Sequence, residues 1–115
     1  MDKFLKRLTS TPNEVMFEQS IQVIDEHFDF HPVSFVNGET QNQAGQNNGS
    51  CKIFAFAQLQ GLDESSTLAC FGEFYRDDVL NNPNGTDHAN IRNFIQHGWS
   101  GIHFDGVALI AKESI

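Results

Sequence analysis

A cysteine, Cys51, is the residue best suited to covalent chemistry in this chain, and it follows a loop rich in glycine and amide side chains. If Ser50 caps a helix, Cys51 lies in the first turn of that helix. There the helix dipole and the free backbone amides favour the thiolate and lower the pKa of the thiol. Gln46 would donate a hydrogen bond to an oxyanion, and His88 or His103 would act as the base. The alternative interpretation is that Cys51 is a small residue packed at a helix start.

The enzyme hypothesis is therefore a small cysteine-dependent hydrolase or transferase. Cys51 would be its nucleophile and His88 its base, with Asp87 or Asn90 orienting the histidine. The other cysteine, Cys70, lies in an apolar stretch and is expected to be structural. Both thiols are expected to be free, because the start of the chain lacks the apolar core of a secretory signal and the cytoplasm is reducing.

Two groups of residues are spaced in a way that could bring metal ligands together. His27, Asp29 and His31 would share one side of an extended segment, and Asp87 with His88 forms a second pair. Two ligands hold a metal poorly, and a helix end would turn His27 away from His31. We therefore expect neither a metal site nor a cofactor. By the same reasoning, the pair at residues 77–78 is expected to be a solvated helix end.

Two segments rich in amide side chains suggest a recognition surface. Residues 46–50 and 82–93 offer side-chain and backbone groups that can bind a peptide or a polar ligand. Helix caps and turns are the competing explanation, and they account for Ser50 but leave several of these residues without a role. The candidate binding residues are Gln46, Asn47, Asn48, Arg92 and Asn93.

The elements that must position these residues are mostly helices. Residues 2–8 are expected to form a short helix. A second helix starts at Thr11, which is followed by a proline and, three residues on, by a glutamate. Its apolar residues recur every three or four positions and predict one buried face up to about residue 28: Phe17, Ile21, Ile24 and Phe28.

Residues 32–49 are rich in turn formers and predict a loop with one short strand at 34–36. The next helix is capped by Ser50, is apolar on nearly all sides and ends at Gly61, although alternation of its apolar residues leaves a strand as the alternative. Asp63 is expected to cap the following helix, which buries Leu68, Phe71, Tyr75 and Val79. A last helix starts at Thr86 or Asp87, turns Ile91, Phe94 and Ile95 inward and stops at Gly98.

The balance of charge excludes some classes of partner. Seven basic and fifteen acidic residues give a net charge of −8 at pH 7, which repels nucleic-acid backbones and anionic membrane surfaces. No apolar stretch approaches the roughly 18 residues that cross a bilayer, so no membrane insertion is expected. We expect instead a protein partner or a polar ligand, and a cytoplasmic location.

The length of 115 residues suits one domain with one core, and eleven phenylalanines indicate that this core is largely aromatic. The predicted fold is mainly α and forms a single domain over residues 1–115. It is a compact bundle of about five helices, with at most a small two-stranded β element near residues 34–36 and 106–110.

Several segments resemble the bacterial HopJ type III effector family. They are AGQNNGSCKIFAFA (44–57), TLACFG (67–72) leading to YRDDVL (75–80), and NPNGTDH (82–88) leading to NIRNF (90–94), with FVNG (35–38) and GWSGI (98–102) extending the match. The resemblance implies a protein that is exported by type III secretion into host plant cells and for which no reaction is established. It favours an interaction module. The alternatives are the hydrolase or transferase that uses Cys51 and a cytoplasmic housekeeping protein that is not exported.

Overall fold

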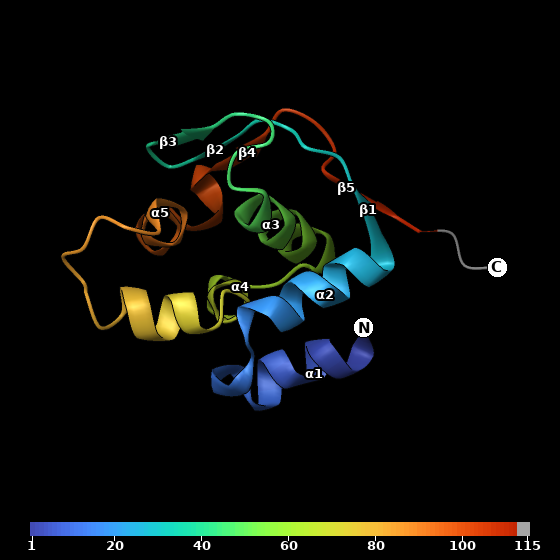
Figure 1. Ribbon diagram of the computed structural model, residues 1–115, viewed down its shortest axis with the longest axis horizontal. Helices are drawn as coiled ribbons and strands as arrows, with labels where there is room; N and C mark the ends of the chain where they lie inside the picture. The colour runs from blue at the N-terminus through green and yellow to red at the C-terminus, as the bar shows by residue number, and fades with distance from the viewer. Residues whose placement is uncertain (113–115) are drawn as a thin grey trace.

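The centre of the fold is the helix α3 (Asn48–Gln60), which the other elements enclose (Figure 1). The structure is a computed structural model that describes residues 1–112. Every residue from Ile53 to Ala57 is buried. A helix that is apolar on all sides has to be covered on all sides, because no face of it suits water. The prediction of a central helix that ends at Gly61 is confirmed, and the alternative of a strand is wrong.

The other helical elements surround α3. They are α1 (Asp2–Ser10), the 3-10 turn η1 (Pro12–Glu14), α2 (Phe17–His27), α4 (Glu64–Ala69), the π-helix η2 (Phe74–Val79), α5 (Ala89–His97) and the 3-10 turn η3 (Gly98–Gly101). Figure 1 shows α2 and α4 on one side of α3 and the strands on the opposite side. The mainly α character is as predicted, but the strands are more extensive than the sequence suggests.

The helix α2 begins later than predicted. The predicted start at Thr11 belongs to η1, and the chain is extended at Val15 and Met16 before α2 begins at Phe17. The carboxylate of Glu73 accepts a hydrogen bond from the Phe17 amide at 2.9 Å. A carboxylate satisfies a free amide at the start of a helix and complements the positive end of its dipole. A contact with a distant residue therefore contributes to the start of α2.

The single helix predicted after Asp63 is divided into α4 and η2. Asp63 caps α4 as predicted, because its carboxylate accepts a hydrogen bond from the Ser66 amide at 2.8 Å. At Gly72 the backbone has a φ of +59°, and a Cβ atom there would clash with the backbone nitrogen of Phe17. Only glycine fits both the positive φ and the close approach. The predicted apolar residues Leu68 and Val79 are still buried, but on two different elements.

The predicted pairing of residues 34–36 with 106–110 is wrong, although both segments do contain strands. Strand β2 (Phe35–Asn37) pairs with β4 (Ile102–Phe104), and β5 (Leu109–Ala111) pairs with β1 (Phe28–Phe30). Both pairs are antiparallel and in the same register, since Phe28 faces Ala111 and Phe35 faces Phe104. The His31 amide donates to the Ala108 carbonyl at 2.7 Å between them. The two pairs thus form one ribbon that crosses α3 (Figure 1).

A hairpin extends this ribbon within the segment that was predicted as a loop. Strand β3 (Thr40–Asn42) pairs with β2 and makes a three-stranded sheet in the order β3-β2-β4. The turn contains Gly38, whose φ is +59° and whose Cα packs against the ring of His97. The hairpin therefore lies on α5, and the short strands are held by this packing more than by their own propensity.

The helix α5 starts at Ala89, after the predicted start at Thr86 or Asp87. Ile91 and Phe94 are buried as predicted. Ile95 is 48% exposed, so its predicted inward position is wrong. The helix ends at Gly98 with a positive φ of 63°, as the glycine predicts.

Candidate functional site

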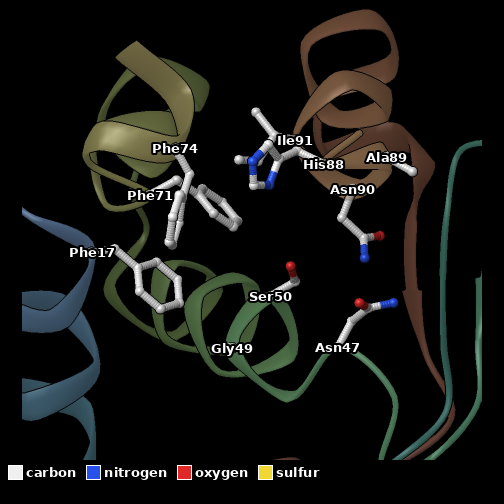
Figure 2. Close-up of a pocket in the computed structure, with 10 residues that line it drawn as sticks. All are labelled: Phe17, Asn47, Gly49, Ser50, Phe71, Phe74, His88, Ala89, Asn90 and Ile91. Atoms are coloured by element: carbon white, nitrogen blue, oxygen red, sulfur yellow. The ribbon is translucent and has the colours of Figure 1, made fainter. Parts of the chain in front are cut away.

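A cleft of about 340 Å³ opens where the first turns of α3 and α5 face each other (Figure 2). The beginning of α2 and the segment around η2 close its other side. Aromatic and polar groups therefore meet in one concavity, as is usual for binding sites. Its lining residues are Phe17, Asn47, Gly49, Ser50, Phe71, Phe74, His88, Ala89, Asn90 and Ile91.

The residues that precede the two helices share an unusual backbone conformation. Asn47 before α3 has a φ of 52° and His88 before α5 has a φ of 51°, and within residues 1–112 they are the non-glycine residues with positive φ. Such a conformation costs about 1 kcal/mol or more and is often found at functional sites. In the described chain no side chain caps either helix through a hydrogen bond to its first turn. The first amides of both helices lie at the cleft, because Gly49, Ser50 and Ala89 line it.

Four asparagines join these two helix starts to the β2–β3 hairpin. The Asn90 side chain, in the first turn of α5, accepts from Asn37 at 3.0 Å and from Asn42 at 3.1 Å. The Asn42 carbonyl oxygen accepts from Asn90 at 3.0 Å and from Asn47 at 2.7 Å. Asn37, Asn42 and Asn90 are buried. This asparagine network holds Asn47 and Asn90 in place at one end of the cleft.

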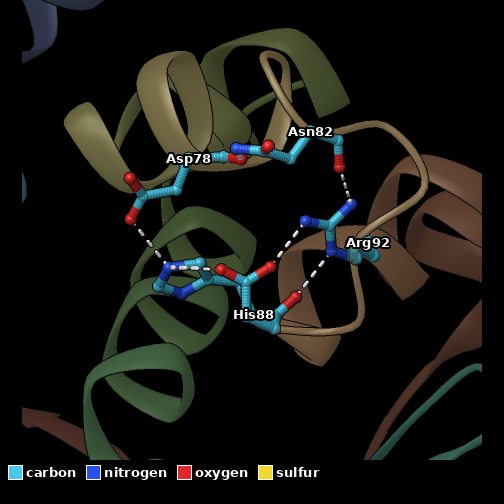
Figure 3. A network of polar contacts seen from close by, with 5 residues as sticks. Asp78, Asn82, His88 and Arg92 are labelled. Carbon is cyan, nitrogen blue, oxygen red and sulfur yellow. Dashed lines mark hydrogen bonds and ion pairs between the residues drawn. The ribbon is translucent and has the colours of Figure 1, made fainter.

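His88 is held on the opposite side by an aromatic contact and by polar contacts, and Figure 3 shows the polar ones. Its ring stacks on Phe74 with centroids 5.2 Å apart. Its Nε2 atom lies 2.9 Å from Asp78 Oδ2 and 3.9 Å from Asp87 Oδ2. Arg92 binds Asp87 Oδ1 at 2.6 Å, and its guanidinium holds the pKa of that exposed carboxyl below its usual range. The expectation that Asp78 belongs to a solvated helix end misses this pairing with His88.

Cys51 does not face the cleft. Its side chain is 1% exposed, and its amide already donates to the Asn47 carbonyl at 3.0 Å. Burial raises the pKa of the Cys51 thiol, although a hydrogen bond with the Val33 backbone lowers it in part. The predicted lowering of the pKa is therefore wrong, since the thiol is buried in the core and does not line the cleft. This arrangement argues against Cys51 as a nucleophile.

Cys70 is enclosed even more completely. Burial raises the pKa of its thiol to about 12, and the cysteines are free thiols rather than a disulfide.

The structure brings three of the predicted site residues to the cleft: Asn47, His88 and Asn90. Other candidates have structural contacts elsewhere. Gln46 accepts a hydrogen bond from the Gln43 amide at 3.1 Å in an exposed loop, and Asn93 donates to Thr40 at 2.6 Å. Arg92 donates to the Asn82 carbonyl at 2.7 Å and closes the loop before α5. Asn48 is an exposed first residue of α3.

Two further residues matter for the geometry of the cleft, although neither is among the candidate binding residues. Ser50 lies in the predicted recognition segment 46–50 and is expected to be a helix cap, but it is the third residue of α3 and its hydroxyl points into the cleft (Figure 2). Phe17 is expected on the buried face of α2, but it forms a wall of the cleft. The position of Ser50 could have been predicted from that of Cys51. Adjacent residues of a helix face different directions, so if Cys51 is buried, Ser50 faces away from the core.

The remaining predictions about metal ligands concern the other end of the molecule. His27 ends α2, and His31 lies exposed beyond β1. Among residues 1–112 no three histidine, cysteine or acidic side chains lie close enough together to hold a metal ion. Within that same range no helix has the length and apolar character needed to cross a bilayer.

Comparisons with known proteins give a family and a fold. The family model described as HopJ type III effector protein matches residues 1–109. A crystal structure of a protein of unknown function, VPA0580, is 54% identical in sequence and covers 97% of this chain and 93% of that chain, with a TM-score of 0.96. No curated protein matches this chain in sequence.

Proposed function

Because this chain belongs to the HopJ type III effector protein family, we propose that it is an effector-type interaction module that binds a polar group of its partner in the cleft between α3 and α5. One observation carries the proposal. Three of the segments that carry the family resemblance, residues 44–57, 67–72 and 82–94, are far apart in the sequence and contribute to the lining of this cleft.

The lining indicates which chemical groups the cleft accepts. Phe17 and Phe74 offer a flat apolar wall, and their rings lie 4.9 Å apart. Ser50 and the first amides of α3 and α5 offer hydrogen-bond donors on the facing side. The chain carries a net charge of −8, yet none of the described lining residues has a carboxylate. A neutral or carbonyl-bearing group of a peptide or small ligand suits this combination.

Binding at the cleft is tested by NMR titration of the 15N-labelled protein with N-acetylphenylalaninamide. We expect shift changes to concentrate at the amides of Gly49, Ser50 and Ala89. The Ser50→Trp variant fills the cleft and should abolish them, whereas Ser65→Trp on the exposed side of α4 should not. Shifts that are absent, or that survive Ser50→Trp in a folded variant, contradict the proposal.

The effector part of the proposal is tested by export. The chain is fused to a reporter enzyme that is active only inside host cells, and it is expressed in bacteria with and without a working type III secretion system. We expect reporter signal only with the working system. Retention in both strains would favour the cytoplasmic housekeeping alternative.

A further inference from the structure

We propose that the cleft catalyses acyl transfer from small neutral esters to water, with Ser50 as the nucleophile, His88 as the general base and Asp78 as the residue that positions His88. This inference rests on the proposed function, because it assumes that the same cleft admits a ligand. The proposed nucleophile is Ser50 and not Cys51, the nucleophile that the sequence predicts.

Ser50 is placed as a nucleophile needs to be. It is the third residue of α3, and Figure 2 shows its hydroxyl directed into the cleft. Across residues 1–112 its side chain makes no hydrogen bond, whereas the hydroxyls of Ser10, Ser20 and Ser100 all donate to backbone carbonyls. The hydroxyl is thus available to a ligand. The neighbouring first-turn amides of α3 can stabilise negative charge on a carbonyl oxygen bound beside it.

His88 is oriented by its partners so that one ring nitrogen is left for the cleft. Nε2 lies 2.9 Å from Asp78 Oδ2, so a proton on Nε2 is donated to this carboxylate and Nδ1 keeps its lone pair. Figure 2 shows the second ring nitrogen on the side of Ser50. The stack on Phe74, at 5.2 Å between centroids, fixes the plane of the ring. The other charged groups beside the ring are Asp87 and its partner Arg92.

The reaction proceeds in two balanced steps. Ser50 Oγ adds to the ester carbonyl carbon while His88 Nδ1 takes the hydroxyl proton; the bond to the alcohol then breaks, and the alcohol leaves with that proton. Water attacks the acyl-serine, again through His88, and releases the carboxylic acid and free Ser50. No hydrogen bond joins Ser50 to His88 in the described chain. The proton therefore crosses through one water or after the side chains approach around a substrate.

The walls of the cleft define the class of substrate. Phe17, Phe74 and Ile91 suit an apolar acyl group, and a volume of about 340 Å³ limits it to a short one. The net charge of −8 disfavours anionic substrates. A neutral ester with a short acyl chain meets these conditions.

The test is hydrolysis of p-nitrophenyl butyrate, together with covalent labelling by a fluorophosphonate probe. We expect the wild-type protein to exceed the buffer rate and to be labelled once, at Ser50. Ser50→Ala should lose both signals, a fall in rate of about 100-fold or more. Ser65→Ala is the matched control at an exposed serine of α4 and should keep both. Activity or labelling that survives Ser50→Ala overturns the proposal, as does a wild-type protein with neither.

The role of Asp78 is tested by a separate measurement, because Asp78 acts on the reaction only by positioning His88. Asp78→Asn should lower kcat by about 10-fold or more with little change in KM. A fall in kcat of less than about twofold, or a change confined to KM, would contradict the role of Asp78. If hydrolysis is absent while N-acetylphenylalaninamide still binds in the NMR titration, the reaction fails and the binding function stands.

Discussion

The reactivity of a cysteine depends on the direction in which its side chain faces. Cys51 and Ser50 are neighbours on one helix and face different surroundings. Ser50 faces the cleft, whereas Cys51 faces the core and is 1% exposed. Proximity to a helix start lowers a thiol pKa only if the sulfur reaches the free amides and water. The desolvation of Cys51 outweighs any benefit of its position, since its pKa is raised.

Burial of both thiols predicts slow labelling of the native protein. At neutral pH, Cys51 and Cys70 should each react with iodoacetamide at least about 100-fold more slowly than in 6 M urea, because the thiolate is disfavoured and the sulfur is covered. Mass spectrometry of peptides after timed quenching measures each site. Rapid native labelling of Cys51 alone would restore the cysteine-dependent enzyme hypothesis.

The Cys70 thiol also predicts a loss of stability at alkaline pH. Its pKa is about 12 in the folded protein and 9.0 ordinarily, so the unfolded chain loses this proton first as the pH rises. The contribution of the thiol is therefore complete below about pH 9 and is lost between pH 9 and 12. The urea midpoint should fall across that window in the wild-type protein. A Cys70→Ala variant should show a smaller fall, and an equal fall would contradict the assignment.

The asparagine network predicts a large effect from one buried amide. Asn90→Ala should lower the free energy of unfolding by about 2 to 3 kcal/mol, because Asn42 loses its donor and acceptor partners inside the protein. Urea denaturation followed by circular dichroism measures the loss. The exposed Asn81 provides the control, and Asn81→Ala should change the value by about 0.5 kcal/mol or less. Equal effects of the two variants would show that the network adds no stability.

At the scale of elements, the contact between the start of α2 and the break after α4 organises the fold. Gly72 lets the chain turn and lets the backbone of Phe17 approach, while the next residue, Glu73, caps α2. The same contact brings Phe17 and Phe74 together, and these rings form the aromatic wall of the cleft. The geometry of the site thus depends on a glycine outside it.

Two glycines with the same backbone conformation test this contact. Gly72 and Gly61 have φ values of +59° and +66°, but a Cβ at Gly61 would meet nothing within 4 Å. Gly61→Ala should cost about 1 to 2 kcal/mol for the left-handed conformation alone. Gly72→Ala adds the clash with the Phe17 backbone and should cost about 2 to 4 kcal/mol. Chemical denaturation of both variants compares them, and equal costs would contradict the close approach.

For the whole molecule, the core is built around one phenylalanine. Phe54 is fully buried in α3, and its ring lies within 6.4 Å of the rings of four residues from different elements: Phe35, Phe71, Phe94 and Trp99. Phe54 therefore joins β2, the segment after α4, α5 and η3, whereas its neighbour Phe56 contacts Phe4 of α1 and Phe28 of β1. Several of the eleven phenylalanines of the sequence thus pack between different helices and strands and hold them together.

Truncation of this ring should destabilise the whole protein. Phe54→Ala is expected to lower the free energy of unfolding by about 3 to 5 kcal/mol, because it leaves a cavity that the surrounding rings cannot fill. Leu59→Ala on the same helix is the control, since Leu59 is 59% exposed and should cost about 0.5 kcal/mol or less. Thermal and urea unfolding report both. A loss below about 1 kcal/mol for Phe54→Ala would show that the core is not centred there.

The sequence by itself determined the features that depend on neighbouring residues. Local spacing and capping sufficed for α1, for the central α3 with its end at Gly61, for the cap at Asp63 and for the end of α5 at Gly98. The family was also visible in the motifs at residues 44–57 and 82–94, which the family model confirms. Asn47, His88 and Asn90 were identified as candidates and do line the cleft.

Only the tertiary structure decided the features that depend on residues far apart. Glu73 caps α2 from 56 positions away, and the strand at 35–37 takes its partner from residues 102–104. Ser50 lines the cleft instead of capping α3, and Cys51 is buried instead of facing it, because the orientation of a helix about its axis is set by what packs against it. Periodicity reports which residues share a face; the energy of burial, summed over the whole fold, selects the face that meets the core.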